Sequence, residues 1–212
     1  MINKTFFDNH LDTLEECVNS ASNEIMQIYN SDSFGQEEKS DGSPLTKADK
    51  KSNEIILDSL RKISKDISII SEETFNEDQI KSLDETYWLI DPLDGTKDFI
   101  QSTGDYAMHL ALNYKQKPYI GIVLIPEKNE LWISNGMEVW CEDKNGLKKK
   151  PKLSSKRTLN EMTLVMSKNH RNDSLKKLIE KVNFKDVVVM GSIGCKIASI
   201  LRGECDIYIC SV

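Results

Sequence analysis

The chain has 212 residues, of which 39% are hydrophobic and 29% charged, so a disordered chain is excluded and one large domain or two small lobes are expected. The net charge of −6 argues against a nucleic-acid polymer as partner, because such a partner selects a basic face. The longest apolar run, residues 119–126, is too short to cross a membrane, and the polar N-terminus lacks the pattern of a signal peptide. No stable membrane association is therefore expected. Five cysteines without a C-x-x-C motif predict free thiols, which are typical of a cytoplasmic protein.

Two amphipathic helices are predicted in the first third of the chain. Apolar residues recur every three or four positions over residues 11–29, the period of a helix with one buried face, and Asp8 is the expected N-cap. A second helix is predicted over residues 47–64. Thr46 followed by Asp49 has the spacing of a capping box, so this helix should begin directly after Thr46.

Strands follow these helices. Residues 67–70 and 87–90 are two short apolar runs, and each leads directly into acidic residues. Further alternating segments with short turns between them predict antiparallel strands over residues 106–114, 119–125, 130–134 and 138–141.

Two polar segments are expected to be irregular. Residues 31–43, which include Gly35 and Gly42, should form a mobile loop. The lysine run at residues 148–150 should form a solvated turn after Asn145 and Gly146.

The last quarter of the chain alternates between strands and helices. Strands are predicted over residues 163–167, 187–190 and 206–210, with helices over 173–182 and 195–201. This β-α-β-α-β order is typical of a layered α/β lobe. We therefore expect an α+β lobe over residues 1–155 and a partial α/β lobe over residues 156–212.

The most informative motif directly follows the predicted strand at residues 87–90 and reads Asp91-Pro92-Leu93-Asp94-Gly95-Thr96. Pro92 fixes its φ angle and should stop strand pairing, so the chain is expected to turn at once. Carboxylates together with an exposed backbone carbonyl are ligands that suit Mg²⁺. The amides of Gly95 and Thr96, where a new helix can begin, suit a phosphate group.

A second acidic strand end strengthens this interpretation. Glu72 and Glu73 follow the strand at residues 67–70, and if the two strands lie side by side, their ends meet. Carboxylates from both ends would then repel one another unless cations sit among them, so a metal site is expected. A capped helix after a polar turn is the alternative that accounts for Asp91, Asp94 and Thr96 without any chemistry.

These motifs resemble a known family. The segment Ser71-Glu72-Glu73, followed by residues 91–96, is similar to the first signature of the inositol monophosphatase superfamily of Mg²⁺-dependent, Li⁺-sensitive phosphatases. Residues 43–49 match the segment that precedes the second helix in that family. Two further segments are similar to the branch of this family that acts on 3'(2'),5'-bisphosphates. They are Lys97-Asp98-Phe99, and residues 191–196 together with Gly203 and residues 206–208. The resemblance spans about residues 10–212.

The resemblance implies a role for each matching residue. The implied metal ligands are Glu72, Asp91, the carbonyl of Leu93, and Asp94. Asp49 and Thr96 would form a short relay that polarises a water molecule. The implied contacts with substrate are Glu72, Leu93, Asp94, Gly95, Thr96, Ser192 and Lys196.

The resemblance also implies fold and chemistry. The expected fold is α/β, the layered α-β-α-β-α type of the sugar phosphatases, with an incomplete C-terminal lobe. Two or three Mg²⁺ ions, inhibition by Li⁺ and direct attack of an activated water on a phosphate monoester are implied. The expected substrate is adenosine 3',5'-bisphosphate, hydrolysed to AMP and phosphate, and an inositol or sugar monophosphate is the alternative. The partner is thus a small phosphorylated molecule, and a homodimer is one of the two oligomeric states that relatives adopt.

One departure from the family pattern concerns a second signature, W-D-x-A, which is expected after the strand at Tyr208. The sequence given ends at Val212, and none of Trp88, Trp132 and Trp140 precedes an aspartate. We therefore expect a truncated copy of a phosphatase, or a shortened form with reduced or no activity. A non-catalytic remnant that binds metal or phosphate is the corresponding alternative outside the enzymes.

The histidines are not assigned to catalysis. His109 lies within an alternating apolar pattern and is interpreted as a packed sheet residue whose ring is satisfied by its neighbours.

Overall fold

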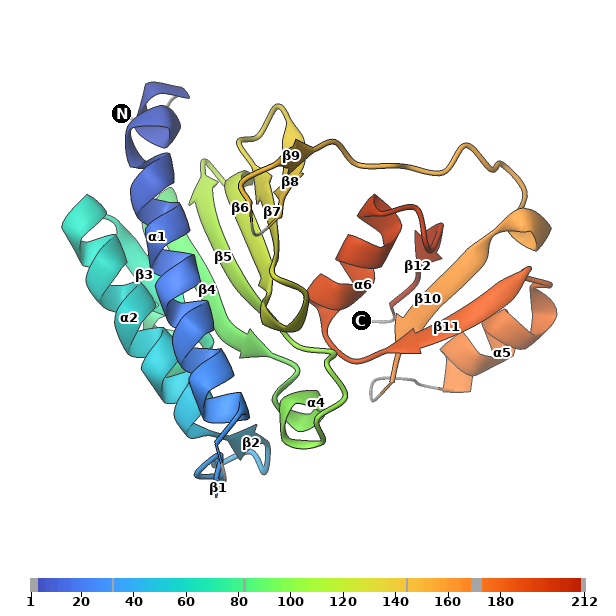
Figure 1. Ribbon diagram of the computed structural model, residues 1–212, viewed down its shortest axis with the longest axis horizontal. Coiled ribbons are helices and arrows are strands. Elements are labelled where there is room, and N and C mark those ends of the chain that lie inside the picture. Colours follow the sequence, from blue (N-terminus) through green and yellow to red (C-terminus); the bar gives the residue numbers. More distant parts are fainter. Residues whose placement is uncertain (1–3, 32, 82, 144, 169–172, 211–212) are drawn as a thin grey trace.

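The computed structural model describes residues 4–31, 33–81, 83–143, 145–168 and 173–210. Helices α1 (Lys4–Tyr29) and α2 (Lys47–Ile63) lie side by side over one face of the large sheet (Figure 1). Helix α1 begins earlier than predicted, so Asp8 lies within it and is not its cap. The capping box of α2 is confirmed, since the Asp49 carboxylate accepts a hydrogen bond from the Thr46 N–H at 2.7 Å.

The large sheet has seven strands in the order β3-β4-β5-β6-β7-β8-β9. Its strands are β3 (Ser68–Ser71), β4 (Thr86–Asp94), β5 (Ala107–Tyr114), β6 (Lys117–Ile125), β7 (Glu130–Ser134), β8 (Val139–Glu142) and β9 (Lys148–Lys149). Strands β3 and β4 are parallel, and the remaining neighbours are antiparallel, as predicted for β5 to β8. The solvated turn expected at the lysine run is wrong for two of its residues, because Lys148 and Lys149 pair with Glu142 and Cys141 as an exposed edge strand.

Helix α4 (Thr96–Ile100) begins at Thr96, where the sequence allowed a new helix to begin. Several other short elements were not predicted. They are β1 (Glu37–Glu38), β2 (Pro44–Leu45), α3 (Glu77–Lys81) and the 3₁₀ turns Glu72–Thr74, Pro126–Lys128 and Leu159–Glu161. Because β1 and β2 pair in an antiparallel ladder, the segment expected to be a mobile loop is partly ordered. This ladder places Lys39 beside the candidate site described below.

The small sheet has three parallel strands, with β10 (Thr163–Ser167) between β11 (Asp186–Met190) and β12 (Ile207–Tyr208). Helices α5 (Asp173–Lys181) and α6 (Ile193–Leu201) complete the predicted β-α-β-α-β order. Strand β12 is shorter than expected. The fold is therefore mixed α/β, as predicted, and the division into lobes at residue 155 stays a prediction.

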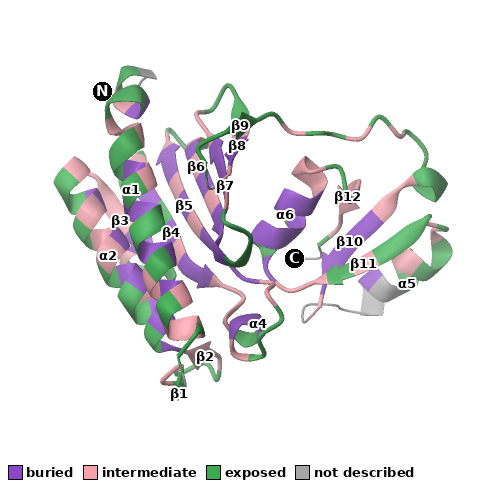
Figure 2. Cartoon of the chain, viewed as in Figure 1, coloured by how far each residue is buried: buried purple, intermediate pink, exposed green. Residues whose placement is uncertain are grey.

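Helix α6 lies between the two sheets, so the layers run helix, sheet, helix, sheet, helix (Figure 1). The main core fills the space between the large sheet and the helix pair α1 and α2, where the facing surfaces are buried (Figure 2). A smaller core lies on the other face of the sheet, where Cys195 and Ala198 of α6 pack with Trp132 and Ile125. Because this second core holds α6 against the sheet, it positions both ends of that helix.

Two further expectations concern membrane association and the state of the cysteines. Among the described residues, no helix has the length and apolar character needed to cross a lipid bilayer. The five cysteines are all free thiols.

Two neighbouring residues of β4 provide a test of the core. The side chain of Ile90 is 2% exposed in the main core, whereas that of Leu89 is 45% exposed on the opposite face. We expect Ile90→Ala to lower the free energy of unfolding by about 2–5 kcal/mol through loss of burial and the cavity left behind. The matched Leu89→Ala change should cost less than about 1 kcal/mol. Urea unfolding of both variants checks this, and equal losses would contradict the assigned face of β4.

Candidate active site

The site is built at the ends of two parallel strands. Ser71 of β3 lies opposite Ile90 of β4, so the residues that follow each strand emerge at one edge of the sheet. The condition on which the sequence prediction depended, two adjacent strands with acidic ends, is therefore met. Glu72 and Asp91 are close enough that Glu72 perturbs the titration of Asp91.

The Asp91–Thr96 segment does not turn where it was predicted to. Strand β4 continues through Pro92 to Asp94, with an irregular register between Asp91 and Asp94 before pairing resumes opposite Ala107. Pro92 interrupts the ladder because it has no N–H, but its fixed φ angle is compatible with extended backbone. The turn comes at Gly95, which has φ of +93°, and an added Cβ there would lie 2.6 Å from the Asp105 carbonyl oxygen. A side chain at this position would therefore be both strained and obstructed.

Asp91 is the most strongly perturbed carboxyl group of the site. Burial, followed by the nearby charges of Glu72 and Asp94, raises the pKa of Asp91 to about 9. Its Oδ1 atom accepts a hydrogen bond from the Leu93 N–H at 3.2 Å, which does not offset these effects. Asp91 therefore holds a proton at neutral pH when no cation is present.

Glu72 is held by a lysine that the sequence analysis missed. The Nζ atom of Lys39 lies 2.9 Å from Glu72 Oε1 and 2.9 Å from Glu73 Oε1. Burial favours the neutral amine, but the two carboxylates outweigh it and raise the pKa of Lys39. Lys39 lies 33 residues from Glu72, and no local pattern marks it. Its role depends on the β1–β2 ladder.

Asp94 is held by the start of α6. Its Oδ2 atom accepts hydrogen bonds from Ser192 Oγ at 2.5 Å and from the N–H groups of Ile193 at 2.6 Å and Gly194 at 3.3 Å. His109 Nε2 lies 3.3 Å from the same oxygen. Burial alone would raise the pKa of Asp94, but His109, Ser192 and the Gly194 N–H lower it to about 2.

The interpretation of His109 as an ordinary packed sheet residue is therefore wrong. Its ring belongs to β5 but reaches the acidic site, because His109 lies opposite Asp91 in the ladder. A Cβ at Gly194 would lie 2.6 Å from His109 Nε2, so the glycine allows the helix to approach the histidine this closely. The alternating pattern of β5 correctly predicted the strand and gave no information about the neighbouring loop.

The structure brings Asp49 and Thr96 together as the resemblance implied. Thr96 Oγ1 lies 3.0 Å from Asp49 Oδ1 and 3.2 Å from the Leu93 carbonyl oxygen. The other carboxylate oxygen of Asp49 accepts hydrogen bonds from the N–H and the hydroxyl of Thr46. The same residue thus caps α2 and orients Thr96, and it is fully buried.

Some of these residues border a cavity of about 540 Å³. Its wall includes Glu72, Asp94, Gly95, Thr96, Lys97, Asp98, Ile193 and Lys196. The amine of Lys196 is directed inward, where it donates a hydrogen bond to the Gly191 carbonyl oxygen, and burial lowers its pKa. The site thus combines a group of carboxylates, a buried lysine and the N–H groups at the start of α6.

The acidic groups are held by several other parts of the protein. Within the part of the chain that is described, no three His, Cys, Asp or Glu side chains are gathered into a metal cluster. Lys39 holds Glu72, and the start of α6 holds Asp94. The donor chemistry nevertheless fits a hard divalent cation, since Glu72, Asp91 and Asp94 offer carboxylate oxygens, and the raised pKa of Asp91 reflects burial and then the nearby charges of Glu72 and Asp94, a repulsion that a cation would relieve.

Comparison with known proteins agrees with this arrangement. The model of the inositol monophosphatase family matches residues 8–211. The chain belongs to the inositol monophosphatase family. As a member of this family, it is a phosphoric monoester hydrolase.

Individual members of this family are similar to the chain in sequence and in structure. The chain is 35% identical over 199 residues to the 3'(2'),5'-bisphosphate nucleotidase CysQ of Buchnera aphidicola, covering 93% of this chain and 74% of the relative. The corresponding CysQ of Shigella flexneri is 30% identical, with 93% and 79% covered. The solved structure of CysQ from Bacteroides thetaiotaomicron superimposes with a TM-score of 0.77 at 26% identity, covering 97% of this chain and 80% of that one. An IMPase of Thermotoga maritima, with a TM-score of 0.80 at 23% identity over 95% and 76% of the two chains, shares the fold.

The raised pKa of Asp91 predicts a pH dependence of stability. The unfolded chain ionises Asp91 near its ordinary value of 3.8, whereas the folded, metal-free protein keeps the proton until about pH 9. The free energy of unfolding should therefore fall as the pH rises through this window, and Asp91→Asn should remove that part of the fall. Urea unfolding in EDTA at about pH 5, 7 and 9 measures it. Asp58→Asn, at an exposed position, is the control, and identical slopes for wild type and Asp91→Asn would contradict the prediction.

Proposed function

We propose that this member of the family is a Mg²⁺-dependent 3'(2'),5'-bisphosphate nucleotidase that hydrolyses adenosine 3',5'-bisphosphate to AMP and phosphate. The observation that carries the proposal is the Asp49–Thr96 hydrogen bond, made by a threonine that lines the same cavity as Glu72 and Asp94, with Asp91 close enough to be perturbed by both of these carboxylates. The names of the CysQ relatives at 30–35% identity support the nucleotide substrate.

In this proposal, Glu72, Asp91, Asp94 and the Leu93 carbonyl hold the cations, two or three in number. Mg²⁺ held there would supply positive charge against the phosphoryl oxygens and would lower the pKa of a bound water molecule. The start of α6, whose Ile193 and Gly194 N–H groups donate to Asp94, lies at the same cavity, where N–H groups at a helix start favour an anionic substrate.

Asp49 and Thr96 orient the attacking water. Thr96 donates its hydroxyl proton to Asp49 Oδ1, at 3.0 Å, so the lone pairs of Oγ1 are directed to accept a proton from the water. Asp49 cannot rotate away, because Thr46 holds its other oxygen at 2.6 and 2.7 Å. The relay is therefore rigid before substrate binds.

The remaining contacts with substrate are assigned around this cavity. Asp94, Gly95 and Thr96, which line it, would face the phosphate, with Glu72 and Leu93 beside them. Ser192 would contact the substrate from the N-cap of α6, and Lys196, which lines the cavity and is 2% exposed, would add positive charge beneath it.

The wider setting is also part of the proposal. The cavity lies between residues 1–155 and 156–212, which we treat as two lobes that together hold a small phosphorylated substrate. The five free thiols favour a reducing compartment, the cytoplasm. A homodimer is compatible with the proposal, and no nucleic-acid polymer or membrane is required for it.

The relay predicts a large kinetic effect. Thr96→Ala should lower kcat for phosphate release from adenosine 3',5'-bisphosphate by about 10²–10⁴-fold, because it removes the group that orients the water. Asp58→Asn, at an exposed position of α2, should leave the rate unchanged. Steady-state phosphate release at saturating Mg²⁺ measures both, and an unaltered kcat in Thr96→Ala would contradict the relay.

Substrate and metal are tested in parallel. Phosphate release should be faster from adenosine 3',5'-bisphosphate than from inositol monophosphate, and EDTA or Li⁺ should suppress it. Equal rates on the two substrates would contradict the nucleotidase assignment in favour of a broader monophosphatase. Binding of Mg²⁺ by calorimetry without any turnover would instead identify a non-catalytic metal-binding protein.

A further inference from the structure

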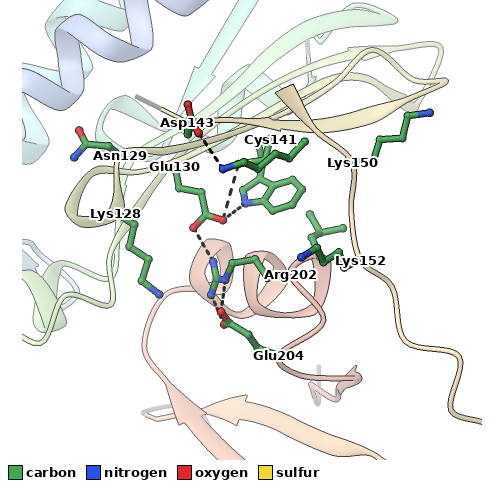
Figure 3. Close-up of a pocket in the computed structure, with 12 residues that line it drawn as sticks. Lys128, Asn129, Glu130, Cys141, Asp143, Lys150, Lys152, Arg202 and Glu204 are labelled. Atoms are coloured by element: carbon green, nitrogen blue, oxygen red, sulfur yellow. Dashed lines mark hydrogen bonds and ion pairs between the residues drawn. The ribbon is translucent and has the colours of Figure 1, made fainter. Parts of the chain in front are cut away.

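A second pocket, of about 430 Å³, lies at the other end of α6 (Figure 3). We call it the Arg202 pocket, and its charged lining residues are Lys128, Lys149, Lys150, Lys152, Arg202, Glu130, Asp143 and Glu204. Among its described lining residues, bases therefore outnumber acids, although the chain as a whole has a net charge of −6. The pocket shares no lining residue with the active-site cavity.

Three of these lysines, Lys128, Lys150 and Lys152, form no ion pair with any described residue, whereas Lys149 is paired with Asp143 at 2.9 Å. In Figure 3 Lys128 and Lys152 extend toward the Arg202 region from opposite sides, while Lys150 points away from it. Positive charge therefore lies on both sides of the guanidinium group, and that of Lys128 is near enough to help lower the pKa of Glu204.

One edge of the Arg202 guanidinium is firmly anchored. Its Nη1 atom lies 2.7 Å from Glu130 Oε2, and the Trp132 indole N–H donates to the other oxygen of Glu130 at 2.9 Å. The side chains of Arg202 and Glu130 are only 18% and 12% exposed. This anchor orients the guanidinium group, because Glu130 belongs to β7 of the large sheet and cannot follow a movement of α6.

The opposite edge of the same group is occupied by a replaceable carboxylate. Nε and Nη2 of Arg202 donate parallel hydrogen bonds to the two oxygens of Glu204, at 2.8 and 2.7 Å. This is the bidentate geometry by which arginine binds carboxylates and phosphates. The Glu204 side chain is 53% exposed and lies two residues from Arg202, so it can rotate into solvent without disturbing the core.

We propose that the Arg202 pocket binds a phosphate group, free or carried by a small molecule, and that Glu204 is a built-in competitor occupying the place of that group. The phosphate would take the Nε and Nη2 edge of Arg202 after Glu204 rotates out. Lys128 and Lys152 would neutralise its remaining charge. A dianion would gain more from the two lysines than the single charge of Glu204 does, which favours the exchange.

The test is designed to exclude the active site. Binding of inorganic phosphate and of ribose 5-phosphate to the full chain is measured by calorimetry in EDTA, so that no divalent cation can hold phosphate at the carboxylates. Thr96→Ala serves as the active-site control and should bind both probes as the wild type does. The result is independent of the proposed function, since a protein without nucleotidase activity would give the same isotherms.

Substitutions of Glu204 and of Arg202 should have opposite effects on phosphate binding. Glu204→Ala removes the competitor and should tighten phosphate binding at least about tenfold, whereas Arg202→Gln should weaken it at least about tenfold. Because Arg202→Gln also leaves Glu130 without its partner and can impair folding, Lys128→Ala and Lys152→Ala provide a second route, each weakening binding several-fold. Lys65→Ala, at an exposed position far along the chain, should have no effect.

Stronger binding by ribose 5-phosphate than by inorganic phosphate would identify a phosphorylated small molecule as the ligand, and the reverse would identify free phosphate. Either result supports the pocket if it depends on Glu204 and the lysines as stated. Unchanged or weaker binding in Glu204→Ala would overturn the proposal. Loss of binding in Thr96→Ala would also overturn it, because the phosphate would then be at the active site.

Discussion

Crowding of negative charge at the ends of two parallel strands is the constraint on which the rest of the site depends. Strands β3 and β4 bring Glu72, Asp91 and Asp94 to one edge of the sheet, where burial strengthens the repulsion between them. Each carboxyl group is compensated differently. Lys39 neutralises Glu72, a bound proton neutralises Asp91, and His109 with the start of α6 stabilises the charge of Asp94.

The groups that compensate these charges come from several elements that pack around the short acidic motif. The β1–β2 ladder delivers Lys39, β5 delivers His109, and α6 delivers its N–H groups. Each of these partners places positive charge or hydrogen-bond donors beside a carboxylate, which is the same electrostatic requirement that divalent cations would meet in the proposed enzyme.

Helix α6 connects the acidic site to the opposite side of the large sheet's second core. Its first turn contacts Asp94, its middle packs into the smaller core through Cys195 and Ala198, and the residue after its last turn, Arg202, is anchored on Glu130. The helix is thus held at both ends by carboxylates of the large-sheet side. The groups that position the helix therefore belong to the acidic site at one end and to the Arg202 pocket at the other.

The sequence alone determined the main elements and half of the site. Helical and alternating periodicities predicted α2, β7 and β10 closely, because burial of one face imposes a period on the residues themselves. The motif at residues 91–96, with Glu72 and Asp49, could be found because strand ends, caps and turn residues are local signals. One local signal was misleading. Pro92 predicted an immediate turn, but the extended backbone of β4 continues to Asp94, with only the N–H of Pro92 missing as a hydrogen-bond donor.

Only the tertiary structure decided which distant residues complete the site. Lys39 reaches Glu72 over 33 positions, Ser192 reaches Asp94 over 98, and Arg202 reaches Glu130 over 72. Such partners leave no periodicity in the sequence, because their identity depends on which loops the packed layers bring together. His109 shows the same limit, since its place in an alternating strand is local whereas its contact with Asp94 follows from strand pairing.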